Sequence, residues 1–258
     1  MKVWLMGKNC SVVRHAVVIC LAMCCCIGFT AGSWAAIEDY TGSYSGTYSG
    51  DDNGVFHVIA GENGAVVGMG WSTDTSEAVE IEGSVDDDGN FDLQDSWGGE
   101  MTGSIDTDGH LTGTWTGGTM SGDLEGQVQD PDQLEAIAGN YAGSSTGDSN
   151  GSWEMTVNAN GYLGGFIDSD TYDTIEPIGG VVNADGVIIA LGDDETMCYG
   201  TVNIDTGRVS GEWYNYDAPE SGTFSGSRVV DDNNDGSNAA IAAPGDGGGG
   251  GCFIQNLY

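Results

Sequence analysis

The chain alternates apolar and polar residues over segments of about five to eight residues, which is the pattern of half-buried β-strands. Turn sequences that end in glycine separate many of these segments, at residues 61–64, 86–89, 106–109, 158–161 and 183–186. Glycine takes the left-handed conformation that closes a short hairpin, so we predict antiparallel strands joined by tight turns. In the first half, the predicted strands begin near Tyr44, Val55, Ala65, Val79, Phe91, Met101, Leu111 and Met120. Helical turns are predicted only at 37–40 and 134–137.

The two halves of the chain are copies of each other. Residues 42–46 (Gly-Ser-Tyr-Ser-Gly) recur 97 positions later as 139–143 (Gly-Asn-Tyr-Ala-Gly). Further along, Trp115 corresponds to Trp213. An internal duplication of this kind predicts two structural units with the same fold. We therefore expect repeat 1 at residues 36–128, a linker at 129–133 and repeat 2 at 134–229.

The alternation also assigns the two faces of the strands. Phe56 and Val58 share the face expected to form the core, whereas His57 and His110 fall on the face expected to meet solvent. Glycines recur in phase with the core face, at Gly68, Gly83, Gly103, Gly113, Gly165, Gly180, Gly200 and Gly211. Inward glycines let a sheet bend sharply enough to close. The prediction is an all-β fold of two tandem, duplicated, antiparallel up-and-down β-barrels of about eight strands each, with little interior space. A continuous open meander or sandwich is the alternative.

The first 35 residues have the features of a secretory signal peptide. Three basic residues precede an apolar run over residues 16–32, and small residues surround the bond between Ala35 and Ala36. We expect processing at this bond and export through the secretory pathway, to the cell surface or the extracellular medium. A retained membrane anchor is the alternative.

The charge of the chain excludes one class of partner. The chain has 40 Asp and Glu against 5 Lys and Arg, and its formal net charge is -35. Three of the basic residues belong to the leader, which leaves Arg208 and Arg228 in the expected exported protein. Nucleic acids and anionic lipids are bound through clustered Lys and Arg, so we expect neither as a partner.

Residues suited to catalysis are scarce. After the leader the chain has two histidines, His57 and His110, and neither recurs in repeat 2 or belongs to a pattern that would hold it as a general base. Cys198 takes the place of the inward Met101, so its thiol is expected in the core. We therefore expect no enzymatic activity and no catalytic residue. A hydrolase that uses two carboxylates is the alternative.

One loop offers a surface for a ligand. Repeat 2 carries an insertion after Trp213, in which Tyr214 and Tyr216 are expected to face opposite to Trp213. Exposed tyrosines beside Asn and Asp stack on, and hydrogen-bond to, a sugar or a partner protein. These three aromatic residues are the candidate site for a glycan or protein ligand. A longer hairpin without a ligand is the alternative.

The segment after repeat 2 contains a candidate metal site. Asp231, Asn233 and Asp235 place oxygen ligands at alternate positions before a glycine, as the first half of a calcium loop does. The position of the bidentate glutamate in such a loop is Ala242 here, so an acidic linker is the alternative. Apart from Ca²⁺ at this segment, no cofactor is expected.

The C-terminal residues resemble a known sorting segment. Residues 230–251 are acidic and glycine-rich, which predicts a disordered linker, and five glycines then lead into Cys252-Phe253-Ile254. A glycine run before Cys-Phe-Ile resembles the CFI-box, a C-terminal segment of diverse exported bacterial proteins. In that family Ala-Thr-Ala-Ala-Tyr-Gly usually follows, so residues 252–258 form a partial box. The resemblance implies processing or attachment to the cell envelope through Cys252.

The glycine and aromatic spacing of the repeats also resembles the compact eight-stranded barrels of bacterial surface lipoproteins. Together with the export signal and the scarce catalytic chemistry, this favours a non-enzymatic exported or cell-surface protein that acts as a binding module. A structural component of the envelope is one alternative, and a carboxylate-dependent hydrolase is the other.

Overall fold

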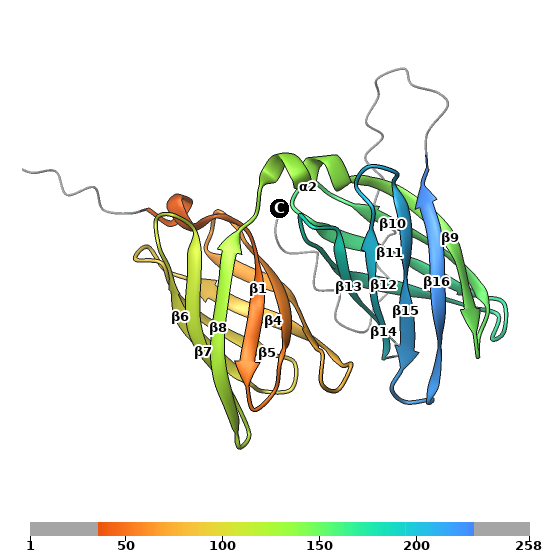
Figure 1. The fold of residues 1–258 in the computed structure, drawn as a ribbon, viewed down its shortest axis with the longest axis horizontal. Helices are drawn as coiled ribbons and strands as arrows, with labels where there is room; N and C mark the ends of the chain where they lie inside the picture. The colour runs from red at the N-terminus through yellow and green to blue at the C-terminus, as the bar shows by residue number, and fades with distance from the viewer. Residues whose placement is uncertain (1–35, 194, 230–258) are drawn as a thin grey trace, which may run out of the picture. The chain divides into compact units, whose positions relative to one another are not determined.

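Each half of the chain is a closed antiparallel β-barrel in the computed structural model, which describes residues 36–193 and 195–229 (Figure 1). Eight strands form each barrel, and each pairs with the next along the chain. The first barrel closes by pairing of β1 (Gly42–Gly50) with β8 (Met120–Val128). The second closes by pairing of β9 (Gly139–Gly147) with β16 (Glu220–Arg228). The predicted fold class is confirmed, and the open meander or sandwich is wrong because the first and last strands of each half are paired.

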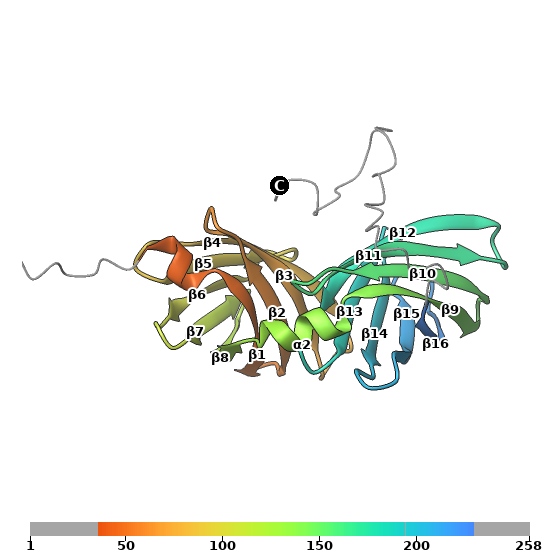
Figure 2. The same ribbon diagram turned by 90° about the horizontal axis from the view of Figure 1, so that it is seen from above.

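The strands of the first half begin within two residues of their predicted positions. Between β1 and β8 lie β2 (Gly54–Ala60), β3 (Ala65–Ser72), β4 (Ala78–Val85), β5 (Asn90–Asp95), β6 (Glu100–Ile105) and β7 (His110–Gly117). Between β9 and β16 lie β10 (Gly151–Val157), β11 (Tyr162–Ser169), β12 (Thr174–Val182), β13 (Val187–Gly192), β14 (Thr196–Val202) and β15 (Arg208–Asn215). Seen from above, the strands of each half follow twisted and curved paths (Figure 2).

A short helix precedes each barrel: the 3-10 helix η1 (Ile37–Tyr40) and the α-helix α2 (Pro131–Ile137). The second begins three residues before the predicted turn. It does so because Pro131 suits the first helical position and the Asp130 carboxylate accepts a hydrogen bond from the Asp132 N–H at 3.0 Å. In the described part of the chain, no helix is both long enough and apolar enough to cross a lipid bilayer.

Glycine-ended turns join strands at the end of each barrel that carries its helix. Gly64, Gly89 and Gly161 have φ angles of +77°, +81° and +85°, in the region that side chains disfavour. Side chains add further bonds: Asp86 Oδ1 accepts from the backbone N–H of Asn90 at 2.8 Å. The hairpins predicted from these turn sequences are confirmed.

Glycines face the interior where neighbouring strands approach closely. Gly143 lies opposite Gly226 across the β9–β16 closure, and the ring of Trp153 covers both. A Cβ atom on Gly143 would lie 2.1 Å from the carbonyl oxygen of Ser225 and 2.5 Å from Trp153 Cζ2. The glycines predicted to face inward meet neighbouring backbone in the same way, at Gly68, Gly83, Gly103, Gly113, Gly165, Gly180, Gly200 and Gly211. The missing side chains let the strands curve, and the aromatic ring restores the packing.

Each barrel has an apolar core that its helix helps to close. The Tyr44 hydroxyl is buried in the first barrel and donates to the Tyr40 carbonyl oxygen at 2.9 Å. Burial, and then the neighbouring Tyr40, raise the pKa of Tyr44 to about 12. In the second barrel, the Tyr141 hydroxyl donates in the same way to the carbonyl oxygen of the fully buried Ile137. Each helix is thereby tied to the first strand of its barrel.

Apolar residues of the second repeat cover the outer faces of β2 and β3. The side chains on these faces join an apolar cluster with residues of β12, β13 and β14; its buried members are Ile59, Met69, Trp71, Ala78, Val181, Ile189 and Met197. The rings of Trp71 and Tyr199 stack with their centroids 4.8 Å apart. His57 lies on the same face of β2 and is 2% exposed. The expectation that His57 faces solvent is therefore wrong, because residues of the second repeat cover it.

Candidate functional site

The second barrel is closed at one end and open at the other. At the closed end, the Arg228 guanidinium lies over the Tyr141 ring, with its Cζ 5.3 Å from the ring centroid. The same guanidinium donates to the carbonyl oxygen of Ala136 in α2 at 2.5 Å. At the opposite end, loops connect β9 to β10, β11 to β12, and β15 to β16, with no described helix across them (Figure 1).

A cavity of about 440 Å³ lies at this open end. Its floor is apolar and includes Trp153, Met155, Leu163, Ile188, Trp213 and Phe224. Two further floor positions carry small residues, since Ala190 and Cys198 stand where repeat 1 has Leu93 and Met101. The volume is in the range of small-molecule sites, about 300–1,000 Å³. The expectation of little interior space is wrong, because the inward side chains leave the open end of the barrel unfilled.

Polar side chains surround the mouth of the cavity. Asn215 Nδ2 donates to Thr196 Oγ1 at 3.1 Å, and the Tyr172 hydroxyl donates to the Glu220 carboxylate. That hydrogen bond raises the pKa of Tyr172, because the carboxylate stabilises the protonated phenol. The charged lining residues are Glu176 and Glu220, so the mouth carries negative charge.

Two indole N–H groups in the cavity wall have no acceptor among the described residues. Trp153 is 5% exposed and Trp213 is 8% exposed, and Nε1 of each is buried and unpaired. Repeat 1 differs at both positions: Phe56 has no donor, and Trp115 Nε1 donates to the carbonyl oxygen of Ser49 at 3.2 Å. A buried donor without a partner costs about 1–3 kcal/mol. Trp213 Nε1 lies against the backbone of β16, 2.5 Å from the position that a Cβ atom on Gly222 would take.

The structure separates the aromatic residues proposed as one ligand site. Trp213 points into the barrel and lines the cavity. Tyr214 points outward from β15 and is 36% exposed, and Tyr216 lies in the following loop and is 57% exposed. The three do not form one surface, because neighbouring residues of a strand point to opposite faces.

Most of the residues predicted for processing, attachment and metal binding lie outside the described part of the chain. Ala35, Asp231, Asn233, Asp235 and Cys252 lie outside the described residues. Ala36 is the first described residue; it is exposed, and its N–H donates to Asp39 Oδ2 at 3.0 Å. Within residues 36–193 and 195–229, no group of three or more His, Cys, Asp or Glu residues could hold a metal ion.

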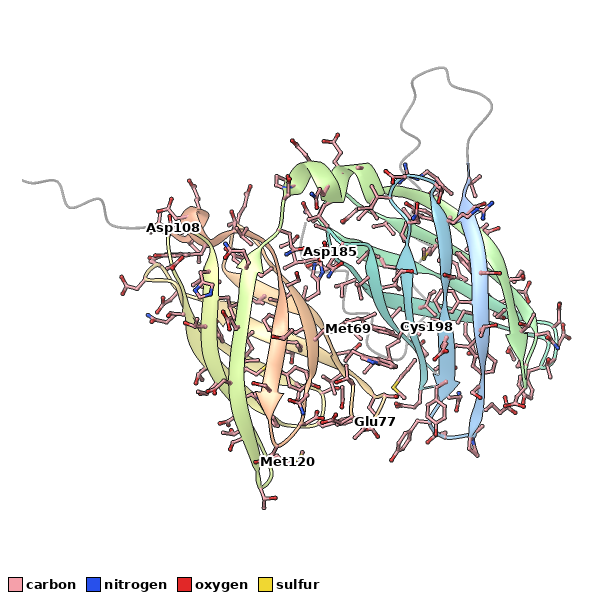
Figure 3. All side chains as sticks on the ribbon, viewed as in Figure 1. Met69, Glu77, Asp108, Met120, Asp185 and Cys198 are labelled. Carbon is pink, nitrogen blue, oxygen red and sulfur yellow. The ribbon has the colours of Figure 1, made fainter. Side chains whose placement is uncertain are left out.

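The two other residues considered for chemistry are also placed. The Cys198 side chain is buried on the inner face of β14, as its correspondence with Met101 predicts (Figure 3). His110 lies on the outer surface of the first barrel, with Nε2 3.6 Å from a carboxylate oxygen of Glu125.

Sequence reasoning did not single out Trp153 as a residue of the cavity wall, although a signal for it existed. The duplication aligns Trp153 with Phe56, which alternation had placed on the core face. A tryptophan at an inward barrel position introduces a donor that needs an acceptor. The change from Phe56 to Trp153 could therefore be seen in the sequence, but the cavity beside Trp153 could not.

No protein-family model matches the chain, and no curated protein matches it. Among solved structures, the chain is similar to a Bacteroides fragilis protein assigned provisionally to the outer membrane, with 12% identity and a TM-score of 0.24. That match covers 75% of this chain and 99% of the other. A second similar structure is the Burkholderia oklahomensis agglutinin, with 12% identity, a TM-score of 0.20, and 72% and 94% of the two chains covered. TM-scores this low do not establish a shared fold, so neither likeness bears on the function of this chain.

Proposed function

We propose that this chain is an exported, non-enzymatic binding protein whose second barrel takes up a small, mainly apolar molecule. The observation that carries the proposal is the apolar cavity of about 440 Å³, lined by Trp153, Met155, Leu163 and Trp213. Apolar pockets with a few placed polar groups are typical of small-molecule sites. The ligand therefore has a mainly apolar body.

The negative charge at the mouth of the cavity restricts the charge of the ligand. Glu176 and Glu220 are the ionisable acids at the mouth, and no Lys or Arg lines the cavity. An anionic ligand would be repelled and would lack a counter-charge. The ligand is accordingly neutral or positively charged.

The apolar floor also refines the expectation of a glycan. A sugar has hydroxyl groups over most of its surface, and each one that is buried without a partner costs free energy. Met155, Leu163 and Ile188 offer it no hydrogen bond. A sugar-like ligand would need an apolar substituent to occupy this cavity.

The test is a fluorescence titration of the full chain with 6-propionyl-2-(dimethylamino)naphthalene. This probe is neutral and apolar, it carries one ketone acceptor, and its emission shifts in apolar surroundings. Saturable binding is expected. Ala190→Leu introduces the larger repeat 1 residue at the floor, so it should weaken binding of the probe to the second barrel.

The matched control is the double variant Tyr214→Ser/Tyr216→Ser, which removes the two outward aromatic residues. It should bind the probe with unchanged affinity. Melting curves of every variant establish that the barrels remain folded. Loss of binding in the tyrosine variant, with full binding retained by folded Ala190→Leu, would move the site to the outer loop and contradict the proposal.

A further inference from the structure

The first barrel has its own cavity, of about 400 Å³, at the end away from η1. Its floor is apolar, formed by Phe56, Ile81, Met101 and Leu124. The rings of Tyr48 and Trp115 form part of its wall; their centroids are 5.8 Å apart and their planes meet at 76°. The floor suits an apolar body, and the wall presents aromatic rings.

The mouth of this cavity differs sharply from that of the second barrel. Six acidic residues line it: Asp51, Asp52, Asp74, Glu77, Asp95 and Glu100. In repeat 2, Ser149 and Gly192 replace Asp52 and Asp95. Glu77 lies at the end of the first barrel opposite to Asp108 (Figure 3). The carboxylates thus gather around one opening, and the two repeats have diverged at it.

The carboxylates with described partners at this mouth are bonded to neutral donors. Asp52 accepts from the Tyr48 hydroxyl at 3.0 Å and from Ser72 Oγ at 2.8 Å. Asp74 accepts from Asn53 Nδ2 at 2.9 Å. No Lys or Arg lines the cavity. Burial and the charge of Asp52 raise the pKa of Tyr48, in keeping with a negative potential inside the opening.

We propose that the first barrel binds an organic cation: a molecule with one ammonium group and an apolar body. The floor takes the apolar part, while Tyr48, Trp115 and the surrounding carboxylates face the ammonium group. Aromatic faces and anions both attract such a head, and they do so most strongly when it is partly desolvated. Among the described residues, no three acidic side chains lie close enough together to hold a metal ion. An organic cation, whose charge is spread over a larger group, therefore fits this opening better than a metal ion. This site lies in the other barrel and does not depend on the proposed function.

The test is calorimetric titration of the full chain with octyltrimethylammonium, octan-1-ol and octanoate, below the concentration at which any of them forms micelles. These probes share the chain length and differ in head-group charge. The mouth variant is Asp52→Asn/Asp74→Asn/Glu77→Gln, which keeps the shape and removes three charges. It should lower the affinity for the ammonium probe at least about tenfold and leave the other two titrations unchanged.

The control removes three charges at the closed end with Glu62→Gln/Asp88→Asn/Asp108→Asn. It changes net charge equally but should leave ammonium binding within about twofold. The proposal is overturned if the mouth variant binds the ammonium probe as the unmodified chain does, or if the control loses as much affinity. Stoichiometric displacement of the probe by calcium at equal ionic strength would assign the opening to a metal ion and also overturn it.

Discussion

His57 is a buried histidine whose two ring nitrogens have no hydrogen-bond partner among the described residues. Burial lowers its pKa from 6.5 to about 3. Below about pH 6.5, the His57 side chain is protonated in the unfolded chain but neutral in the folded chain. The contribution of this group to stability is therefore fully present above pH 6.5 and decreases as the pH falls toward 3. Between about pH 6.5 and pH 5, where most carboxylates stay ionised, the free energy of unfolding should decrease by up to about 1.4 kcal/mol per pH unit. Urea unfolding at several pH values measures this slope.

The variant His57→Leu removes the titrating group and should flatten the slope in this window. At neutral pH it should be as stable as the unmodified chain or more so, because an unpaired polar group is removed from an apolar site. His110→Gln, at a half-exposed position, is the control and should keep the slope. If His57→Leu and the unmodified chain lose stability in parallel, His57 is not the group responsible.

At the scale of the strands, the closure of each barrel depends on inward glycines. Gly143→Ala would place a Cβ atom 2.1 Å from a backbone oxygen and 2.5 Å from the Trp153 ring, so backbone or ring must shift. We expect a loss of more than about 2 kcal/mol in the free energy of unfolding. Gly164→Ala, on β11, is the control because its Cβ would have no neighbour within 4 Å. Equal stability of the two variants in urea unfolding would show that the β9–β16 contact is not tightly packed.

The strands and turns could be predicted from the sequence because the interactions that form them are local. Turn glycines such as Gly89 and alternation such as that around Phe56 fix hairpins and faces within a few residues. The covered outer face of β2 was not readable, because His57 is buried by residues more than 100 positions away in the chain. The cavity was not readable either, because it depends on how inward side chains of many strands combine, Ala190 and Cys198 among them.

At the scale of the whole molecule, the charge should govern stability at low salt. The chain carries 40 acidic groups, and the basic residues after position 35 are Arg208 and Arg228. Mutual repulsion is screened as the Debye length falls from about 30 Å at 0.01 M salt to about 10 Å at 0.1 M. The melting temperature should therefore rise with sodium chloride over this range. A flat response in calorimetry would mean that the carboxylates are too far apart to repel one another appreciably.

The central claim is that the second barrel encloses a ligand site. A crystal structure of the full chain with 8-bromooctan-1-ol tests it most directly, because the anomalous signal of bromine locates the ligand independently of any assumption about its site. The account predicts a bromine peak inside the second barrel, among Trp153, Met155 and Cys198. Bromine peaks found only outside this barrel, or no peak at saturating ligand, would contradict it.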